Sequence, residues 1–308
     1  MNFEFSKRKN NFIEKYDYGK DIVGFDEYVL RFVSSCPLGC FYCYLRDVNL
    51  QKHQPMVYTN FDQLRGELEE LCKSLDKDCR IYLNAGENSD SLVFEPQAGL
   101  VKFLDRFISE KSHIRQKIKI ELRTKTDNIS CLKDIENKDR FIVSFSISPQ
   151  NIIDRYEPKS ASLENRLFVM RKCQEWGFSV GFRFEPIIIQ ENIFEEYKRV
   201  FELAKDKRLF EEPQKIHSIG FSCLRFTRGL MKKIKESHSP WAVALLSQEF
   251  VPCPDGKFRY FRAIRSRIYR MLIDLARKHT SIDKIFLSSE PVYIWQDCGL
   301  NHADFTLF

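Results

Sequence analysis

The stretch Cys36-Pro-Leu-Gly-Cys-Phe-Tyr-Cys43 places three thiols at C-x3-C-x2-C spacing, directly after the apolar, strand-like run Tyr28-Val-Leu-Arg-Phe-Val33. Gly39 allows the backbone to turn tightly between the first two cysteines. Thiolates are ligands for soft metal centres, and a [4Fe-4S] cluster is normally held by four of them. A loop that supplies three therefore leaves one iron open to a small-molecule ligand.

Zinc is the alternative metal for this loop. A structural zinc site requires a fourth Cys or His at short spacing. The nearest candidate, His53, lies well beyond Cys43 and outside the usual pairing interval. The spacing therefore favours an iron-sulfur cluster over zinc, with Cys36, Cys40 and Cys43 as the metal ligands.

Composition is that of a globular enzyme, because 308 residues with 43% apolar side chains can bury an ample core. The first residues lack the apolar core and cleavage site of a secretory signal. We therefore expect a cytoplasmic protein whose remaining cysteines are reduced and buried. No apolar run approaches the about 18 residues of a membrane span, so we also expect a soluble protein.

Strand-like and helix-like segments alternate along the chain, which predicts a parallel sheet covered by helices. The chain is short for a full TIM barrel with an N-terminal segment. We therefore predict a partial, open (β/α)6 TIM-like barrel over 26–235, preceded by an arm or cap (1–25) and followed by an extension packing on the barrel (236–308). The predicted strands are 28–34, 80–84, 118–124, 141–148, 179–189 and 216–224, and the predicted helices are 61–75, 97–110, 161–176, 191–206 and 258–279.

Polar residues stand where several of these strands end, which is where barrel enzymes place their functional groups. Gly86-Glu87 follows the second strand; its carboxylate is suited to an ammonium ligand, although the segment Glu87-Asn-Ser-Asp90 also fits a polar turn with a helix N-cap. Lys125 follows the third strand and Ser146 lies on the fourth. These side chains are expected to meet at one edge of the sheet.

Taken together, these segments resemble radical S-adenosylmethionine (SAM) enzymes, and in particular the spore photoproduct lyase family. The resemblance implies a [4Fe-4S] cluster with SAM on its open iron, bound through Gly86, Glu87, Lys125, Ser146 and Glu185. It rests on an ordered set of matches: Cys40-Phe-Tyr-Cys-Tyr-Leu45, Thr124-Lys125, Phe145-Ser-Ile147, Arg155-Tyr-Glu-Pro-Lys-Ser160 with Arg166, Gly181-Phe182, Pro186-Ile187 and Arg225-Phe-Thr227.

The resemblance implies a reaction as well. In the family, cleavage of SAM yields a 5′-deoxyadenosyl radical that abstracts hydrogen from a thymine photolesion, and a cysteine with a tyrosine pair returns the hydrogen. Tyr42 and Tyr44 match that pair, but Glu87-Asn-Ser-Asp90 carries no thiol where the donor cysteine is expected. Another thiol (Cys223 or Cys253), direct donation by a tyrosine, or a different substrate would each account for this. We favour a different substrate.

Cations interleaved with aromatic residues between Lys257 and Arg270 have two interpretations. A second basic group includes Arg225 and Arg228. The two groups could neutralise nucleic-acid phosphates, with Arg225, Arg228, Arg262 and Arg265 as candidates. Alternatively the cations between Lys257 and Arg270 form the solvated face of an amphipathic helix, the interpretation we favour. Its predicted buried stripe consists of Phe261, Ile264, Ile268, Met271 and Leu275.

The sequence thus predicts a radical SAM enzyme acting on a nucleic acid or nucleotide. Its reductant would be a carrier such as flavodoxin or ferredoxin. A true photolesion lyase with a rerouted hydrogen donor is one alternative. A non-enzymatic Fe-S or zinc protein that binds nucleic acid is the other.

Overall fold

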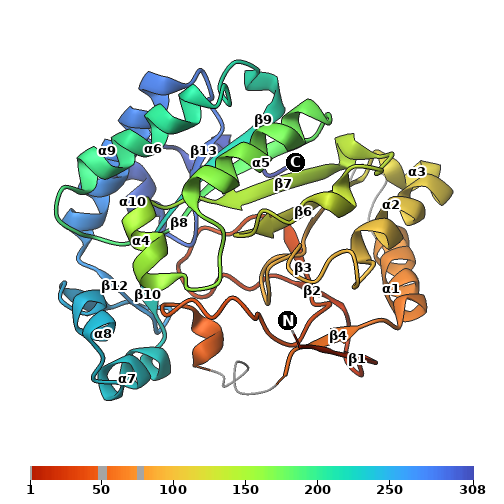
Figure 1. The fold of residues 1–308 in the computed structure, drawn as a ribbon, viewed down its shortest axis with the longest axis horizontal. Coiled ribbons are helices and arrows are strands. Elements are labelled where there is room, and N and C mark those ends of the chain that lie inside the picture. The colour runs from red at the N-terminus through yellow and green to blue at the C-terminus, as the bar shows by residue number, and fades with distance from the viewer. Residues whose placement is uncertain (1, 48–53, 75–79) are drawn as a thin grey trace.

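A curled sheet forms the centre of the computed structural model, which describes residues 2–47, 54–74 and 80–308 (Figure 1). It has eight strands in the order β13-β9-β8-β7-β6-β5-β3-β2. The six strands from β9 to β3 pair in parallel and each overlaps one of the six predicted strands, although β3 ends four residues earlier than predicted. The predicted partial (β/α)6 barrel is therefore confirmed. These strands are β3 (Glu27–Leu30), β5 (Ile81–Asn84), β6 (Ile118–Thr124), β7 (Phe141–Ser146), β8 (Ser179–Ile187) and β9 (Ile216–Cys223).

Helices surround the outer side of this sheet (Figure 1). They bury one stripe each: in α6, Tyr197, Val200, Phe201 and Ala204 recur at helical spacing and face the strands. Ser162 begins α5 by accepting a hydrogen bond from the Asn165 backbone N–H. The longer helices are α1 (Phe61–Ser74), α2 (Leu100–Glu110), α5 (Leu163–Glu175), α6 (Ile193–Asp206), α7 (Arg228–Glu236) and α9 (Arg262–His279); the shorter ones are α3 (Ser112–Arg115), α4 (Gln150–Tyr156), α8 (Pro240–Leu245) and α10 (Val292–Asp297).

Both ends of the chain contribute strands to the central sheet. β2 (Ile13–Lys15) pairs antiparallel with β3 at one edge, and β13 (Ile285–Leu287) pairs in parallel with β9 at the other. The sheet therefore includes one strand that precedes the predicted boundary at residue 25 and one that follows the predicted boundary at residue 235. A separate pair of short parallel strands joins β1 (Glu4–Ser6) to β4 (Met56–Tyr58).

The start of the last long helix differs from the prediction. Residues Phe258–Tyr260 form β12, which pairs with β10 (Arg225–Phe226) and β11 (Phe250–Pro252), so α9 begins only at Arg262. The predicted buried stripe is also displaced, because Phe261 is 49% exposed. The residues of α9 that are buried are Arg265, Ser266, Ile268, Tyr269, Leu272, Ile273, Leu275 and Ala276.

A buried ionic network fills the interior of the barrel. Glu121 accepts hydrogen bonds from Arg183 Nε at 2.8 Å, Arg123 Nε at 2.8 Å and Ser144 Oγ at 2.6 Å. Burial alone would raise the pKa of Glu121, but the two guanidinium groups hold it well below its usual range. A Cβ at Gly181 would lie 2.2 Å from Ser144 Oγ, so only glycine fits beside this network.

Among the residues that the structure describes, no helix combines the length and apolar character needed to cross a membrane.

Candidate active site

A cavity of about 460 Å³ lies at the carboxyl ends of the parallel strands. Because these ends meet at one edge of a parallel barrel, residues distant in sequence face one another there. The cavity brings together every residue predicted for the metal, the cofactor and catalysis: Cys36, Cys40, Cys43, Tyr42, Tyr44, Gly86, Glu87, Lys125, Ser146 and Glu185.

The three cysteines of the loop border this common space. Gly39 adopts a φ of 69°, and the Cys43 backbone N–H donates to the Cys40 carbonyl at 3.2 Å, so the loop turns tightly. Burial raises the pKa of all three thiols, that of Cys36 to about 12. A positively charged centre would therefore be needed to hold them as thiolates at neutral pH.

The chemistry of the donor set fits an iron-sulfur cluster, because three thiolates are ligands typical of such clusters. Within residues 2–47, 54–74 and 80–308, no three His, Cys, Asp or Glu side chains are placed to hold one metal ion. His53, the zinc alternative, lies outside the described residues.

Glu157 organises one wall of the cavity from a buried position. Its carboxylate accepts hydrogen bonds from the Tyr42 hydroxyl and from Arg166, and from Lys125 Nζ at 3.2 Å. Burial would raise the pKa of Glu157, but Lys125 and Arg166 lower it to about 2, so the carboxylate is ionised. Lys125 Nζ also donates to the Glu185 carbonyl at 3.3 Å. Tyr42 and Lys125 are therefore held by one anion that the sequence analysis did not single out.

Glu87 accepts hydrogen bonds from two tyrosines that line the cavity. The Tyr44 hydroxyl donates to the Glu87 carbonyl at 2.8 Å, and the Tyr16 hydroxyl donates to Glu87 Oε1 at 3.1 Å. A Cβ at Gly86 would lie 2.4 Å from Arg123 Cβ, so this segment packs closely on β6. Tyr16 belongs to the N-terminal segment, and it was not among the predicted site residues.

Asp90 fastens the segment after β5 to the end of β6. Its buried carboxylate accepts from the backbone N–H of Lys125 at 2.6 Å and of Leu92 at 2.9 Å, and from Thr124 Oγ1 at 3.0 Å. Burial raises the pKa of Asp90. No helix begins at Glu87–Asp90, so Asp90 fixes the cavity wall and does not act as a helix N-cap.

The four arginines proposed for nucleic-acid binding lie in three different settings. Arg225 lines the cavity, beside Lys257, whereas Arg228 is exposed at the start of α7 and Arg262 at the start of α9. Arg265 is 1% exposed and pairs with the buried Glu290. The prediction for Arg265 is therefore wrong, because a desolvated and ion-paired guanidinium cannot reach a phosphate.

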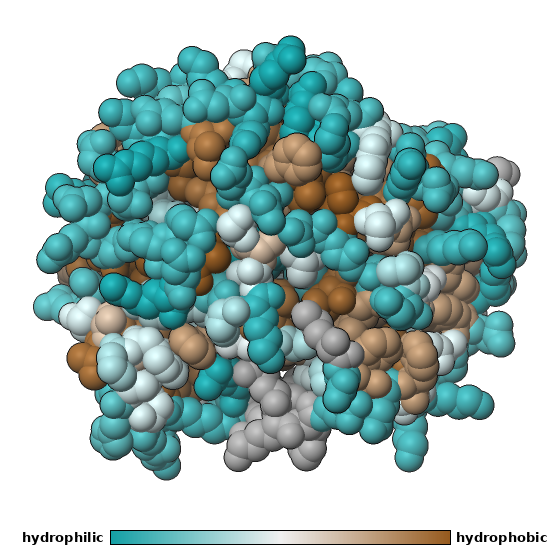
Figure 2. All heavy atoms as spheres, in the orientation of Figure 1, coloured by the Kyte–Doolittle hydropathy of each residue, from teal (hydrophilic) through white to brown (hydrophobic). Residues whose placement is uncertain are grey.

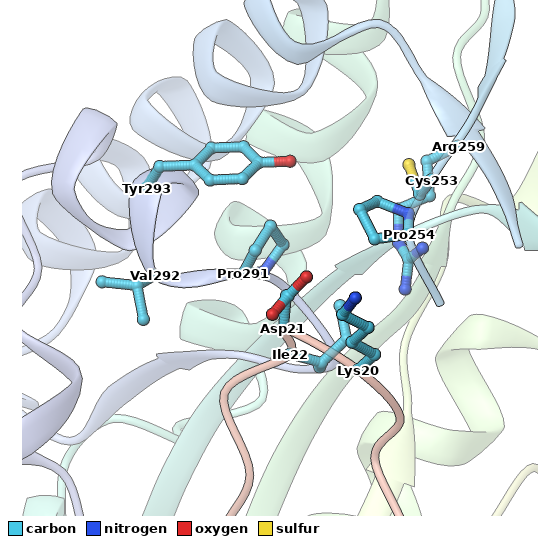
Figure 3. Close-up of a pocket in the computed structure, with 9 residues that line it drawn as sticks. All are labelled: Lys20, Asp21, Ile22, Cys253, Pro254, Arg259, Pro291, Val292 and Tyr293. Carbon is cyan, nitrogen blue, oxygen red and sulfur yellow. The ribbon is translucent and has the colours of Figure 1, made fainter. Parts of the chain in front are cut away.

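The two further cysteines considered as hydrogen donors border different cavities. Cys223 ends β9 and adjoins the active-site cavity, with 3% of its surface exposed and its backbone N–H donating to the Tyr269 hydroxyl at 2.7 Å. Burial raises the pKa of its thiol. Cys253 instead lines a second cavity of about 470 Å³, together with Pro254, Lys20 and Tyr293 (Figure 3).

Comparison with known proteins matches this chain to a family. A model of the family described as spore photoproduct lyase matches residues 15–260. This chain belongs to the spore photoproduct lyase family. The resemblance seen in the sequence is thereby confirmed.

Curated members of the spore photoproduct lyase family align with this chain over part of their length. The spore photoproduct lyase of Clostridium acetobutylicum is 27% identical over 180 residues, which is 58% of this chain and 52% of the relative. That of Bacillus subtilis is 27% identical over 217 residues, which is 69% of this chain and 60% of the relative. The aligned region thus spans little more than half the length of these relatives.

Solved structures of other proteins share the fold of this chain. A spore photoproduct lyase complexed with dinucleoside spore photoproduct superimposes with a TM-score of 0.73 at 19% identity, covering 92% of this chain and 81% of that one. SuiB of Streptococcus suis bound to S-adenosylmethionine gives a TM-score of 0.52 at 9% identity, covering 87% of this chain and 51% of that one.

Proposed function

We propose that this protein is a radical SAM enzyme that holds a [4Fe-4S] cluster through Cys36, Cys40 and Cys43 and acts on a nucleic acid or nucleotide. When bound and reduced, the cluster supplies the electron that cleaves SAM into methionine and a 5′-deoxyadenosyl radical. The observation that carries the proposal is the cavity in which the three loop thiols meet Lys125, Glu87 and Glu185.

The residues around the cavity have complementary parts in binding SAM. Lys125 presents an ammonium group to a carboxylate, and Glu87 presents a carboxylate to an amino group. Glu157 holds the Lys125 ammonium group by an ion pair at 3.2 Å, so the lysine is oriented before the ligand arrives. Ser146 contributes a hydroxyl from the end of β7.

A substrate of the nucleotide class is supported by two observations. Arg225 and Lys257 bring two cations to the same cavity, which suits a phosphate-bearing ligand. In addition, the solved relatives that share the fold include one complexed with dinucleoside spore photoproduct.

Photoproduct cleavage itself is the second candidate, and it is favoured by membership of the family. A thymine radical must receive a hydrogen atom from a weak S–H or O–H bond, and Glu87–Asp90 offers no thiol. Cys223 adjoins the cavity, and Tyr16 and Tyr44 line it, so each is a candidate donor. We propose a related nucleotide substrate as the first choice and the photoproduct as the second.

The decisive experiment is anaerobic reconstitution with iron and sulfide, followed by reduction in the presence of SAM. The proposal predicts release of 5′-deoxyadenosine and methionine, and loss of both in Cys40→Ala. Cys131→Ala, a partly buried thiol outside the cavity, is the matched control and should retain both products. A protein that only binds nucleic acid would release neither product. Adding a photolesion dinucleotide, undamaged DNA or RNA to the same assay then separates the substrate classes.

A further inference from the structure

Helices α7 and α8 cover the outer side of the cysteine loop. α7 is anchored on Asp47, just beyond that loop: Lys233 Nζ donates to the Arg46 carbonyl at 3.2 Å, and Thr227 Oγ1 donates to Asp47 Oδ2. A Cβ at Gly229 would lie 2.1 Å from Asp47 Oδ1, so the helix fits closely against this residue. The position of α7 is therefore tied to that of the loop.

A stacked aromatic pair joins the loop to the surface of α8. Phe41 lies between Cys40 and Tyr42, and its ring stacks on Trp241 with centroids 4.6 Å apart and planes 19° apart. The Arg46 guanidinium lies 5.6 Å and 5.7 Å from the two ring centroids. Trp241 is partly exposed, so two rings in contact span the distance from the cysteine loop to solvent.

The outer face of these helices combines two apolar residues, Trp241 and Val243, with several cations and one acidic residue, Glu236, which pairs with Lys232 at 3.8 Å. Val243 is 68% exposed, and the Lys232 side chain is 76% exposed. Brown, apolar atoms stand among teal, polar ones at the corner of the molecule where Figure 1 places α7 and α8 (Figure 2). We call this face the α7–α8 surface; it consists of Arg228, Lys232, Lys235, Trp241 and Val243.

The α7–α8 surface adjoins the loop but not the substrate cavity. No residue of either helix, both of which are described in full, is among those that line the cavity. A polyanion bound here would gain phosphate contacts without placing a base in the cavity, and it would gain nothing from Val243. Exposed apolar residues next to exposed cations are instead typical of a protein interface.

We propose that the α7–α8 surface docks an acidic, low-potential one-electron carrier protein that reduces the cluster. The inference rests on the proposed function, because it assumes a cluster at Cys36, Cys40 and Cys43. In the step itself the carrier loses one electron and the cluster gains one, and no covalent bond changes. Opposite charge guides the encounter, and the contact through Trp241 and Phe41 keeps the distance between the two redox centres short.

The test compares two reductants on the reconstituted holoenzyme. Cluster bleaching is followed by stopped-flow absorbance with reduced flavodoxin, an acidic carrier, and with dithionite, which needs no docking surface. In Lys232→Glu/Lys235→Glu we expect reduction by flavodoxin to slow by about tenfold at low salt and to lose most of its salt dependence. Reduction by dithionite should be unchanged. Lys102→Glu, at an exposed position of α2, is the matched control and should behave as the unmodified protein.

A second variant separates apolar contact from charge. Val243→Asp changes an exposed position, and we expect it to weaken flavodoxin binding in calorimetry while its cluster still forms. Equal flavodoxin rates and affinities in all variants would overturn the inference. So would a loss of polynucleotide binding in the charge-reversal variant with flavodoxin reduction intact, since the surface would then be a nucleic-acid face. Failure of the dithionite-reduced enzyme to cleave SAM would refute the proposed function alone, because cluster bleaching by flavodoxin is measured without SAM.

Discussion

Removing the charge of Glu157 should destabilise the whole barrel. The Glu157 and Arg166 side chains are both 0% exposed and form an ion pair, so Glu157→Gln leaves a buried guanidinium without its counter-charge. Breaking one partner out of a buried pair costs about 3–5 kcal/mol. We expect the free energy of unfolding at pH 7 to fall by that amount.

Urea denaturation followed by circular dichroism measures this loss. With a dependence on urea of about 3 kcal/mol per M, the midpoint should fall by about 1 M or more. The control is Glu157→Leu/Arg166→Met, which replaces both charges by apolar groups and should recover most of the stability, because the desolvation penalty of the pair disappears with it. A loss below about 1 kcal/mol in Glu157→Gln, or a double variant no more stable than the single one, would refute this account of the wall.

Three other predictions follow from single contacts. Cys40→Ala should abolish cluster assembly, and iron retained at the level of the unmodified protein would contradict the ligand assignment. Burial lowers the pKa of His217 from 6.5 to about 3, so the folded protein resists protonation of this ring and loses stability as the pH falls from 6.5 towards 3. His217→Gln should therefore reduce the loss of unfolding free energy between pH 7 and pH 5 by about 2 kcal/mol, which denaturation at the two pH values measures. Arg262→Ala should weaken polynucleotide binding and flatten its salt dependence with little effect on stability, and unchanged binding would contradict this role. Arg265→Ala should lower the unfolding free energy by about 3–5 kcal/mol because Glu290 is left buried and unpaired, and unchanged stability would contradict that role.

The barrel strands could be predicted because each is a short run of apolar or alternating apolar residues between helix-like segments or turns. Phe141–Ser146 and Ser179–Ile187 are buried on both faces, and such strands read as almost continuous apolar stretches. The edge strand Ile13–Lys15 could not be predicted, since Glu14 and Lys15 are exposed, Ile13 is only partly buried, and the strand owes its conformation to pairing with β3. Tertiary pairing also decided the start of α9, because β12 takes residues that fit the helical pattern.

The same distinction applies to the site. Strand ends point to Lys125 and Ser146, because parallel topology alone brings them together. Glu157 follows a short helix and shows no spacing signal, although it lies in a segment that resembles the family. Arg265 misled because an arginine on an amphipathic helix is normally solvated, and only the fold reveals Glu290 opposite it.

The placement of β13 and the residues after it has a consequence for biosynthesis. His217, which belongs to β9, has Nε2 2.8 Å from the carbonyl oxygen of Leu307, so a buried ring nitrogen is satisfied by a residue 90 positions further along the chain. Until the segment 285–307 has been synthesised, β9 has an unpaired edge and this imidazole lacks its backbone partner. The nascent barrel therefore stays an incompletely paired, aggregation-prone intermediate over this interval, which makes it a natural client for chaperones.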